Sequence, residues 1–409
     1  MPQITMRTIM HIDADAYFAS VEQGFNPLIS NHPVIVGGAE NQRGVVHTAS
    51  YEARTHGVCT GMPLIQAKAI CPDAVFFKGN FEHYKAVSLI LQEEYLNYTP
   101  IVEFTSLDDA YLDLTGTLHL HPHPQKIAAE IQNRILKKVG VGLSFGIASN
   151  KTIANIASGL HKPGGITYVA QGKEKEFLAP LAVDQLPGIG RMAKEKLTDL
   201  SIFTIKQLAD LPKRLVEQLF GSKTGTRIWE FANGIDSHEV KRKVIPKQIS
   251  RETSFEEDTS DMSIIKGTLQ YLTERVAQKL REQNLQCQTL NVKIRYSDFS
   301  TNNRSHSLPH PSDEGTTLYN MIDKIFNEIL LRRIRIRHVG VAASNISPRN
   351  WQASLFSKRT RKEILNYTID HIRGKYGFMS ILPAETVELK QKYRMEPNGF
   401  ILHNPALTR

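Results

Sequence analysis

The sequence predicts an α+β fold assembled from several small domains. The first 150 residues contain segments in the order strand, insert, helix, strand, strand, helix, strand, and residues 248–346 show a similar order without the insert. This order is typical of a split β-α-β antiparallel sheet with helices on one face, the ferredoxin-like arrangement. A chain of 409 residues is also too long for one ordinary domain, so we expect two to four.

The first predicted sheet begins with the apolar segment 8–13 (TIMHID), which ends in an acid. Residues 81–96 have helical apolar spacing through Tyr84, Val87 and Leu91. The insert between these segments would form a small separate lobe. Further strands are predicted at 34–36, 45–48, 101–104, 110–114 and 141–148, and further helices at 62–70 and 126–139.

The second half of the chain begins with short helices over 170–237 and a charged, proline-containing linker at 238–247. A second α+β domain follows. Its markers are helices at 263–283 and 315–331 and strands at 289–296 and 333–342. The remaining residues predict one helix, near 358–373.

Composition and charge indicate a folded protein with a polyanionic partner. Apolar residues make up 41% of the chain and charged residues 22%, and no segment predicts a membrane span or a secretory signal. Three scattered cysteines predict a reducing compartment. The net charge of +9 is uneven: residues 1–240 carry 22 basic and 24 acidic side chains, and residues 241–409 carry 28 and 17. This asymmetry suggests a nucleic-acid-binding module, although a solvated basic surface would have the same composition.

Four carboxylates form the first candidate site. Asp13 and Asp15 end the first predicted strand, and Asp108 and Asp109 occupy a turn between two middle strands. These positions can be neighbours at the centre of the sheet, where carboxylates would bind Mg²⁺ or Mn²⁺. By alternation along a strand, both Asp13 and Asp15 could be ligands. The alternative is that these acids serve as turn and capping residues.

A second candidate set combines hydroxyl and basic groups. Tyr51 and Arg54 are three residues apart, on one face of a helical turn that follows Thr48, and Lys162 precedes a Pro-Gly-Gly turn. Such groups can hold a triphosphate. An ordinary helix start with a surface arginine is the alternative.

Two further segments suggest contacts with a nucleic-acid backbone. Gly188 and Gly190 lie in LPGIG before an amphipathic helix, a pattern that fits a helix-hairpin-helix as well as a plain helical turn. Arg333, Arg335 and Arg337 alternate with isoleucines, which predicts a strand with one basic face. That face suits DNA phosphates, or protects a sheet edge.

At this point the sequence resembles the Y-family translesion DNA polymerases, closest to the DNA polymerase IV branch. The resemblance runs from about residue 8 to about residue 356. Several long motifs in the same order carry it: HIDADAYFASVE (11–22), PVIVGG (33–38), TASYEAR (48–54), GVCTGMPLIQAKAICP (57–72), SLDDAYLDLTG (106–116), FGIASNKTIANIAS (145–158), HKPGGI (161–166) and LPGIG (186–190).

The resemblance implies a right-hand polymerase with a ferredoxin-like palm, small fingers, a helix-hairpin-helix thumb and a C-terminal α+β little finger. The implied boundaries are palm 1–17 and 81–168, fingers 18–80, thumb 169–237, linker 238–247, little finger 248–346 and a tail at 347–409. Fingers this small would cover the nascent base pair loosely and tolerate damaged templates.

The resemblance also implies residue roles. Asp13 and Asp108 would bridge two metal ions, with a carbonyl ligand from Ala14, whereas Asp15 matches an acid that is not usually a ligand. Thr48, Tyr51, Arg54 and Lys162 would bind the incoming nucleotide. Phe18 would be the steric gate that excludes ribonucleotides, and Ser106 opens the second acidic motif.

One position departs from the family pattern. Asp109 stands where these polymerases normally have Glu, so the carboxylate is kept on a side chain one methylene shorter. We expect retained activity, with weaker binding of the metal near the primer 3′-hydroxyl or a preference for Mn²⁺ as the possible costs.

Gln352, Leu355 and Phe356 resemble the Gln-x-x-Leu-Phe peptide that docks bacterial polymerases on the ring-shaped sliding clamp. Their place just after the little finger supports that reading. The alternative is a tail segment folded onto its own domain.

The sequence therefore predicts a template-directed, low-fidelity DNA polymerase without a proofreading exonuclease. Its expected partners are primer-template DNA, deoxynucleoside triphosphates, two Mg²⁺ ions and the sliding clamp, in a cytoplasmic monomer. One alternative is an inactive adaptor that binds DNA and clamp. Another is a nucleotide cyclase, which would need no grip on a duplex.

Overall fold

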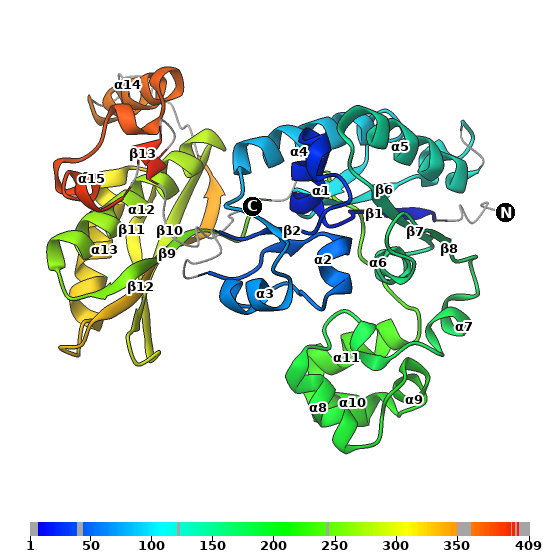
Figure 1. Cartoon of the computed structure of the whole chain (residues 1–409). Helices are drawn as coiled ribbons and strands as arrows, with labels where there is room; N and C mark the ends of the chain where they lie inside the picture. The colour runs from blue at the N-terminus through cyan, green and yellow to red at the C-terminus, as the bar shows by residue number, and fades with distance from the viewer. Residues whose placement is uncertain are drawn as a thin grey trace, which may run out of the picture. The chain divides into compact units, whose positions relative to one another are not determined.

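The computed structural model describes residues 7–38, 44–120, 123–242, 245–349, 361–393, 395–396 and 399–400 (Figure 1). Contacts between residues divide the chain into two units, Met1–Val244 and Ile245–Arg409. The α+β class predicted from the sequence is confirmed in both units. Within the described parts of the chain, no helix is long and apolar enough to cross a membrane.

A five-stranded sheet forms the centre of the first unit, in the order β5-β6-β1-β7-β8. The central strand β1 runs antiparallel to both β6 and β7, as predicted. The sequence analysis missed β8, a three-residue strand parallel to β7. The strands are β1 (Ile9–Ala14), β5 (Val102–Phe104), β6 (Asp109–Asp113), β7 (Leu143–Ala148) and β8 (Ile166–Tyr168).

Helices cover both faces of this sheet, so the prediction of helices on one face is wrong. Met10 and Ile12 of β1 share a core with α4 (Phe81–Leu96) and α5 (Pro124–Val139). On the opposite face lies α6 (Lys151–Leu160), which approaches β7 at Gly146. A Cβ at Gly146 would lie 1.9 Å from the carbonyl oxygen of Ala154, so only glycine permits this contact.

The insert after β1 begins with α1 (Tyr17–Phe25), which packs in the core of the large sheet, and the elements that follow form a small core of their own. A short sheet in the order β3-β2-β4 packs against two helices through Ile35, Ala53 and Leu64. The strand predicted at 45–48 is displaced, because Val45 makes only an isolated bridge with Pro63. The elements are β2 (Val34–Val36), β3 (Thr48–Ala49), β4 (Val75–Phe77), α2 (Tyr51–Thr55) and α3 (Leu64–Ile70).

Short helices complete the first unit, as the sequence predicted. Their apolar residues, among them Leu197, Val216 and Ile228, share a core that also includes Ile9 and Ala148 of the large sheet. The helices are α7 (Glu174–Leu178), α8 (Arg191–Asp199), α9 (Ile205–Ala209), α10 (Lys213–Phe220) and α11 (Ser222–Ala232).

The second unit contains an antiparallel sheet in the order β11-β10-β12-β9, with α12 and α13 packed on one face. The predicted element order is confirmed, but β12 begins at Ile336, so the strand predicted from 333 starts too early. The elements are β9 (Gln248–Thr259), α12 (Met262–Glu282), β10 (Leu285–Tyr296), β11 (Thr301–Ser312), α13 (Gly315–Ile329) and β12 (Ile336–Pro348).

The C-terminal residues extend the core of the second unit. Phe378 and Phe400 are buried with the side chains of α12 and α13. Arg373, only 4% exposed, donates to Glu274 of α12 (3.0 Å) and lies 4.2 Å from the ring centre of Phe378. The helix predicted near 358–373 is therefore present, and Arg373 holds it against α12. The elements are α14 (Arg361–Tyr376), α15 (Leu389–Lys392), β13 (Met395–Glu396) and β14 (Gly399–Phe400).

Candidate active site

The strand register brings the predicted carboxylates together at one end of the large sheet. Asp13, near the end of β1, lies directly opposite Asp109 at the start of β6. The backbone N–H of Ala14 donates to the carbonyl oxygen of Asp108 (3.1 Å), which holds the acidic turn beside the same strand end. Ser106 fixes that turn, because its hydroxyl accepts from Asp109 N (2.9 Å) and bonds to the carboxylate of Asp108.

The electrostatics of this strand end are those of crowded, half-buried acids. Burial raises the pKa of Asp109 to about 7, and the charges of Asp13 and Asp108 add to the effect. Burial also raises the pKa of Asp13, against the opposing influence of Lys162, whose ammonium forms an ion pair with Asp13 Oδ1. The site concentrates negative charge and has one basic partner at its edge.

The donor set fits a hard divalent cation. Carboxylate oxygens are the ligands that Mg²⁺ and Mn²⁺ prefer, and the crowding that raises the pKa of Asp109 is relieved by a nearby cation. In the described part of the chain, no three His, Cys, Asp or Glu side chains already converge as a ligand cluster. The fit therefore rests on the chemistry and charge of Asp13, Asp108 and Asp109.

Asp15 has a different position from Asp13, although alternation would place both on one face. The strand ends at Ala14, and Ala16 adopts a left-handed conformation with φ 46°, so the chain turns before Asp15 can continue the pattern. The Asp15 carboxylate is buried and accepts hydrogen bonds from Ser144 Oγ (2.7 Å), Gly164 N (2.8 Å) and Tyr51 Oη (3.3 Å).

The predicted nucleotide-binding residues approach the same strand end from two segments. Tyr51 and Arg54 lie on α2, which Ser50 caps and which follows Thr48 in β3. The Arg54 guanidinium lies 4.7 Å from the ring centre of Tyr51, and its Nε donates to Ala49 O (2.9 Å). Burial, with a contribution from Asp15, raises the pKa of Tyr51 to about 12, so its hydroxyl remains a donor at neutral pH.

Phe18 lies on α1, within an aromatic cluster. Its ring stacks on Tyr84 with 4.5 Å between ring centres, and Phe81 meets it edge-on at 5.6 Å. Tyr84 is itself held by a hydrogen bond to Glu22 (2.5 Å). These contacts fix the orientation of the Phe18 ring.

The glycine turn predicted as a phosphate contact precedes α8. Gly188 has φ +100°, a conformation that favours glycine, and Gly190 is the residue before the first turn of α8. The predicted turn-then-helix geometry is therefore present.

The strand predicted at 333–337 begins only at Ile336, so Arg333 and Arg335 lie in the loop before β12. The predicted alternation still holds there, because Arg333 and Arg335 are exposed whereas Ile334 and Ile336 pack on the core. Arg337 lies within β12, but it donates to both carboxylate oxygens of Asp258 (3.1 Å each) and stacks on Phe299. Arg337 is thus committed to its own unit.

A polar sheet face in the second unit was missed by the sequence analysis. Leu290, Val292 and Ile294 of β10 face the helices, so Asn291 and Lys293 face the opposite way. Their register partners on the neighbouring strands share that face: Ser305 and Asn303 on β11, Gly340 and Ala342 on β12, and Ser250 and Glu252 on β9. The only signal in the sequence was the run of small polar residues that now forms β11.

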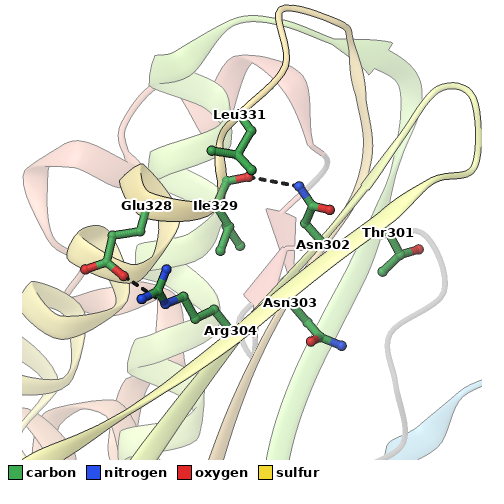
Figure 2. Close-up of a pocket in the computed structure, with 7 residues that line it drawn as sticks. All are labelled: Thr301, Asn302, Asn303, Arg304, Glu328, Ile329 and Leu331. Atoms are coloured by element: carbon green, nitrogen blue, oxygen red, sulfur yellow. Dashed lines mark hydrogen bonds and ion pairs between the residues drawn. The ribbon is translucent and has the colours of Figure 1, made fainter.

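Two other features are the predicted clamp peptide and a cavity in the second unit. Gln352, Leu355 and Phe356, the predicted clamp peptide, fall outside the described residues. A cavity of about 360 Å³ lies in the second unit between β11 and the end of α13, where Asn302 donates to Ile329 O (3.2 Å) and Arg304 pairs with Glu328 (3.1 Å) (Figure 2). Its lining is Thr301, Asn302, Asn303, Arg304, Glu328, Ile329 and Leu331.

Comparison with known families covers most of the chain. Residues 12–159 match the impB/mucB/samB family, residues 246–355 match the C-terminal domain of that family, and residues 184–236 match the thumb domain of DNA polymerase-iota.

Individual relatives and solved structures agree with these matches. DNA polymerase IV of Dehalococcoides mccartyi is 38% identical over 391 residues, which cover 95% of this chain and all of that protein. DNA polymerase IV of Clostridium perfringens is 34% identical over 340 residues, 83% of this chain and 94% of that protein. Among solved structures, a Y-family DNA polymerase chimera of Dbh and Dpo4 has a TM-score of 0.77 at 26% identity and covers 83% of this chain and 99% of its own. An insertion ternary complex of Dbh DNA polymerase has a TM-score of 0.63 at the same identity and coverage. The chain therefore belongs to the Y family of translesion DNA polymerases, in the DNA polymerase IV branch.

Proposed function

We propose that this polymerase joins deoxynucleotides to a primer at the end of β1 that carries Asp13, and that two Mg²⁺ ions are held there by Asp13, Asp108 and Asp109. The observation that carries the proposal is the register of β1 and β6, which sets Asp13 opposite Asp109 beside the Asp108 turn. The backbone carbonyl of Ala14 is the remaining protein ligand. Mn²⁺ would bind the same oxygen donors and substitute for Mg²⁺.

The reaction is a displacement at phosphorus. The primer 3′-oxygen forms a bond to the α-phosphorus of the nucleotide, and the bond to the departing pyrophosphate breaks. Bound divalent cations supply Lewis-acid activation of the 3′-hydroxyl and offset charge on the leaving group. Tyr51, Arg54 and Lys162, with Thr48 nearby, bind the triphosphate. The basic groups neutralise charge, and the Tyr51 hydroxyl exchanges its hydrogen bond to Asp15 for one to a phosphate oxygen.

Phe18 selects the sugar in this account. Its ring would lie against the 2′ position of the incoming nucleotide, where a hydroxyl would clash. The packing of Phe18 between Tyr84 and Phe81 supports this role, because a gate must resist displacement. A side chain free to rotate would admit ribonucleotides.

DNA would be gripped by several surfaces that contact phosphates without reading sequence. The Gly188–Gly190 turn offers backbone N–H groups at the start of α8, and the polar sheet face of the second unit offers hydroxyl, amide and basic side chains. Arg333 and Arg335 add exposed positive charge to the second unit. Arg337 adds little, because its guanidinium is paired with Asp258. Binding of this kind weakens steeply with salt, so synthesis without a clamp would be weakly processive.

In this proposal the chain is organised as a hand. The palm comprises 1–17 and 81–168, the fingers 18–80, the thumb 169–237 and the little finger 248–346. The supporting features are the separate core of the insert and the common core of the short helices. We further propose a cytoplasmic monomer.

We also propose that Gln352, Leu355 and Phe356 bind the sliding clamp, with the two apolar side chains filling a pocket on the ring. Replacing Leu355 and Phe356 with alanine should abolish stimulation of synthesis by the clamp and leave basal synthesis unchanged. Stimulation that survives the replacement would refute this assignment.

Asp109 is the ligand whose role most needs testing. An aspartate reaches less far than the glutamate that the family resemblance implies here, so a small backbone shift or a bridging water would complete the contact. We expect activity with Mg²⁺, and a change of less than about tenfold in Asp109→Glu. A much larger gain would show that the natural site is impaired.

The experiment that tests the function is primer extension on a defined template with Mg²⁺ and, separately, Mn²⁺. Template-dependent addition by the natural chain is expected with either ion. Asp113→Ala is the matched control for Asp108→Ala, because Asp113 lies at the far end of β6. Loss in Asp108→Ala with activity kept in Asp113→Ala supports the proposal. Absence of addition with both ions, with DNA binding intact, would favour the adaptor that the sequence left open.

A further inference from the structure

The turn that carries Lys162 is held by side chains outside the residues assigned to nucleotide binding. Gly164, two residues after Lys162, donates its backbone N–H to Asp15 Oδ2 (2.8 Å) and to Ser144 Oγ (3.1 Å). Its carbonyl oxygen accepts from Gln132 Nε2 (2.8 Å). Both backbone polar groups of this one exposed glycine are therefore bound by side chains of the palm sheet and α5.

Gln132 joins this turn to the start of β7. The side-chain amide donates one hydrogen bond to Leu143 O (2.9 Å) and the other to Gly164 O, so both of its N–H groups are used. Gln132 belongs to no motif, and by sequence it is one more polar residue on α5.

Asp15 joins the same turn to the fingers segment. Its buried carboxylate accepts from Ser144, from Gly164 and from the hydroxyl of Tyr51. Several donors stabilise a carboxylate that has left water. Tyr51 and the turn that carries Lys162, both assigned with Arg54 to the triphosphate, are thus tied to one buried acid.

The reach of Lys162 depends on the backbone of this turn. Its four-carbon side chain is flexible, and a side chain of this kind can be directed only by fixing its Cα and its neighbours. The ammonium now meets Asp13 at the carboxylate site, with 24% of the side chain exposed. Displacement of the turn by about 1 Å would move the charge away from a triphosphate bound there.

We propose that Gln132, Ser144 and Asp15 form a brace of positioning residues that holds Lys162 in place for the incoming nucleotide. None of the three touches the reacting atoms in this account. The inference rests on the proposed role of Lys162, and it adds a residue on α5 that the family motifs do not contain.

The test is a double-mutant cycle between Gln132→Met and Lys162→Ala, with KM for the nucleotide and kcat measured at saturating primer-template. Methionine keeps the length of glutamine and removes both hydrogen bonds. Loss of two such bonds is expected to raise KM about tenfold and to change kcat less. If Gln132 acts through Lys162, the double variant should match Lys162→Ala alone.

Gln92→Met is the matched control, because Gln92 lies on α4 and donates only to Ser88 one turn earlier. It should leave KM unchanged. Should Gln132→Met not fold, Ser144→Ala can replace it in the cycle, because it removes one hydrogen-bond donor to Asp15. Ser144→Ala should show the same coupling with Lys162→Ala.

Two results would overturn the brace. Additive effects of Gln132→Met and Lys162→Ala on KM would mean that Gln132 acts independently of Lys162 and only supports the fold. A lower thermal stability of Gln132→Met would not change that conclusion. An unchanged KM in Lys162→Ala, with template-dependent synthesis intact, would refute both the brace and the assigned role of Lys162. A change in Lys162→Ala together with additivity would refute the brace alone.

Discussion

The carboxylate end of β1 and the polar sheet face of the second unit arrange their charges differently. The first brings Asp13, Asp108 and Asp109 together, and burial, with the charges of Asp13 and Asp108, raises the pKa of Asp109 to about 7. The second carries hydroxyls and amides on β9, β10 and β11, and its acid Glu252 is paired with Lys293 (3.0 Å) and His338 (2.9 Å). In the proposed function, the chemistry depends on a few crowded acids, whereas DNA binding is distributed over many weak contacts.

The largest effect should come from the acids at the strand end. Asp108→Ala should lower kcat on the order of 10³-fold, because it removes charge stabilisation from the transition state. DNA affinity should change little. Single-turnover extension and a binding titration separate the two, with Asp113→Ala as control. An equal loss in both variants would mean that general damage to β6, rather than the site, is being measured.

A smaller effect is expected for sugar selection. Phe18→Ala should raise incorporation of ribonucleotides relative to deoxynucleotides by about 100-fold, because a steric filter of this size is removed. The measurement is the ratio of kcat/KM for the two sugars opposite one template base. Phe81→Leu, which alters the edge contact but keeps Phe18, should shift the ratio far less. An unchanged ratio in Phe18→Ala would remove the gate assignment.

Substitutions in the polar sheet face of the second unit should change DNA binding and leave kcat unchanged. Glu252→Gln frees Lys293 and His338 for phosphates, so DNA affinity should rise by about threefold and the salt dependence should steepen by about one unit. The value of kcat should stay the same at saturating DNA. Lys293→Gln should show the opposite trend. No change in the salt dependence of either variant would argue that this face does not contact the duplex.

The smallest effect concerns stability and pH. The hydrogen bond from His338, with help from Lys293, lowers the pKa of Glu252 to about 2 from an ordinary value of 4.5. A lowered carboxyl pKa stabilises the fold above about pH 4.5, and this contribution is lost as the pH falls toward 2. Urea unfolding midpoints of the natural chain and Glu252→Gln should therefore differ at pH 6 and converge near pH 2. A constant difference would contradict the ion-pair account.

The same contrast explains what the sequence could predict. The strand order, the bounds of α4 and the meeting of Asp13 with Asp109 follow from local alternation and from antiparallel pairing.

The rest depends on contacts that no local pattern encodes. Only the packing of α6 explains why β7 needs Gly146, and only the tertiary turn at Gly164 explains the roles of Gln132 and Ser144. The arginine alternation at 333–337 placed the start of the strand too early, because tertiary pairing begins β12 at Ile336. The polar sheet face was missed because small polar residues have no distinctive period.

The central claim is that Asp13, Asp108 and Asp109 bind the divalent cations of the reaction. The most direct measurement is Mn²⁺ counting by electron paramagnetic resonance in a complex of the polymerase, a 3′-deoxy-terminated primer-template and the matching nucleotide. The account predicts two bound ions for the natural chain and for Asp113→Ala, and fewer for Asp108→Ala. Two ions of unchanged affinity in Asp108→Ala would contradict it.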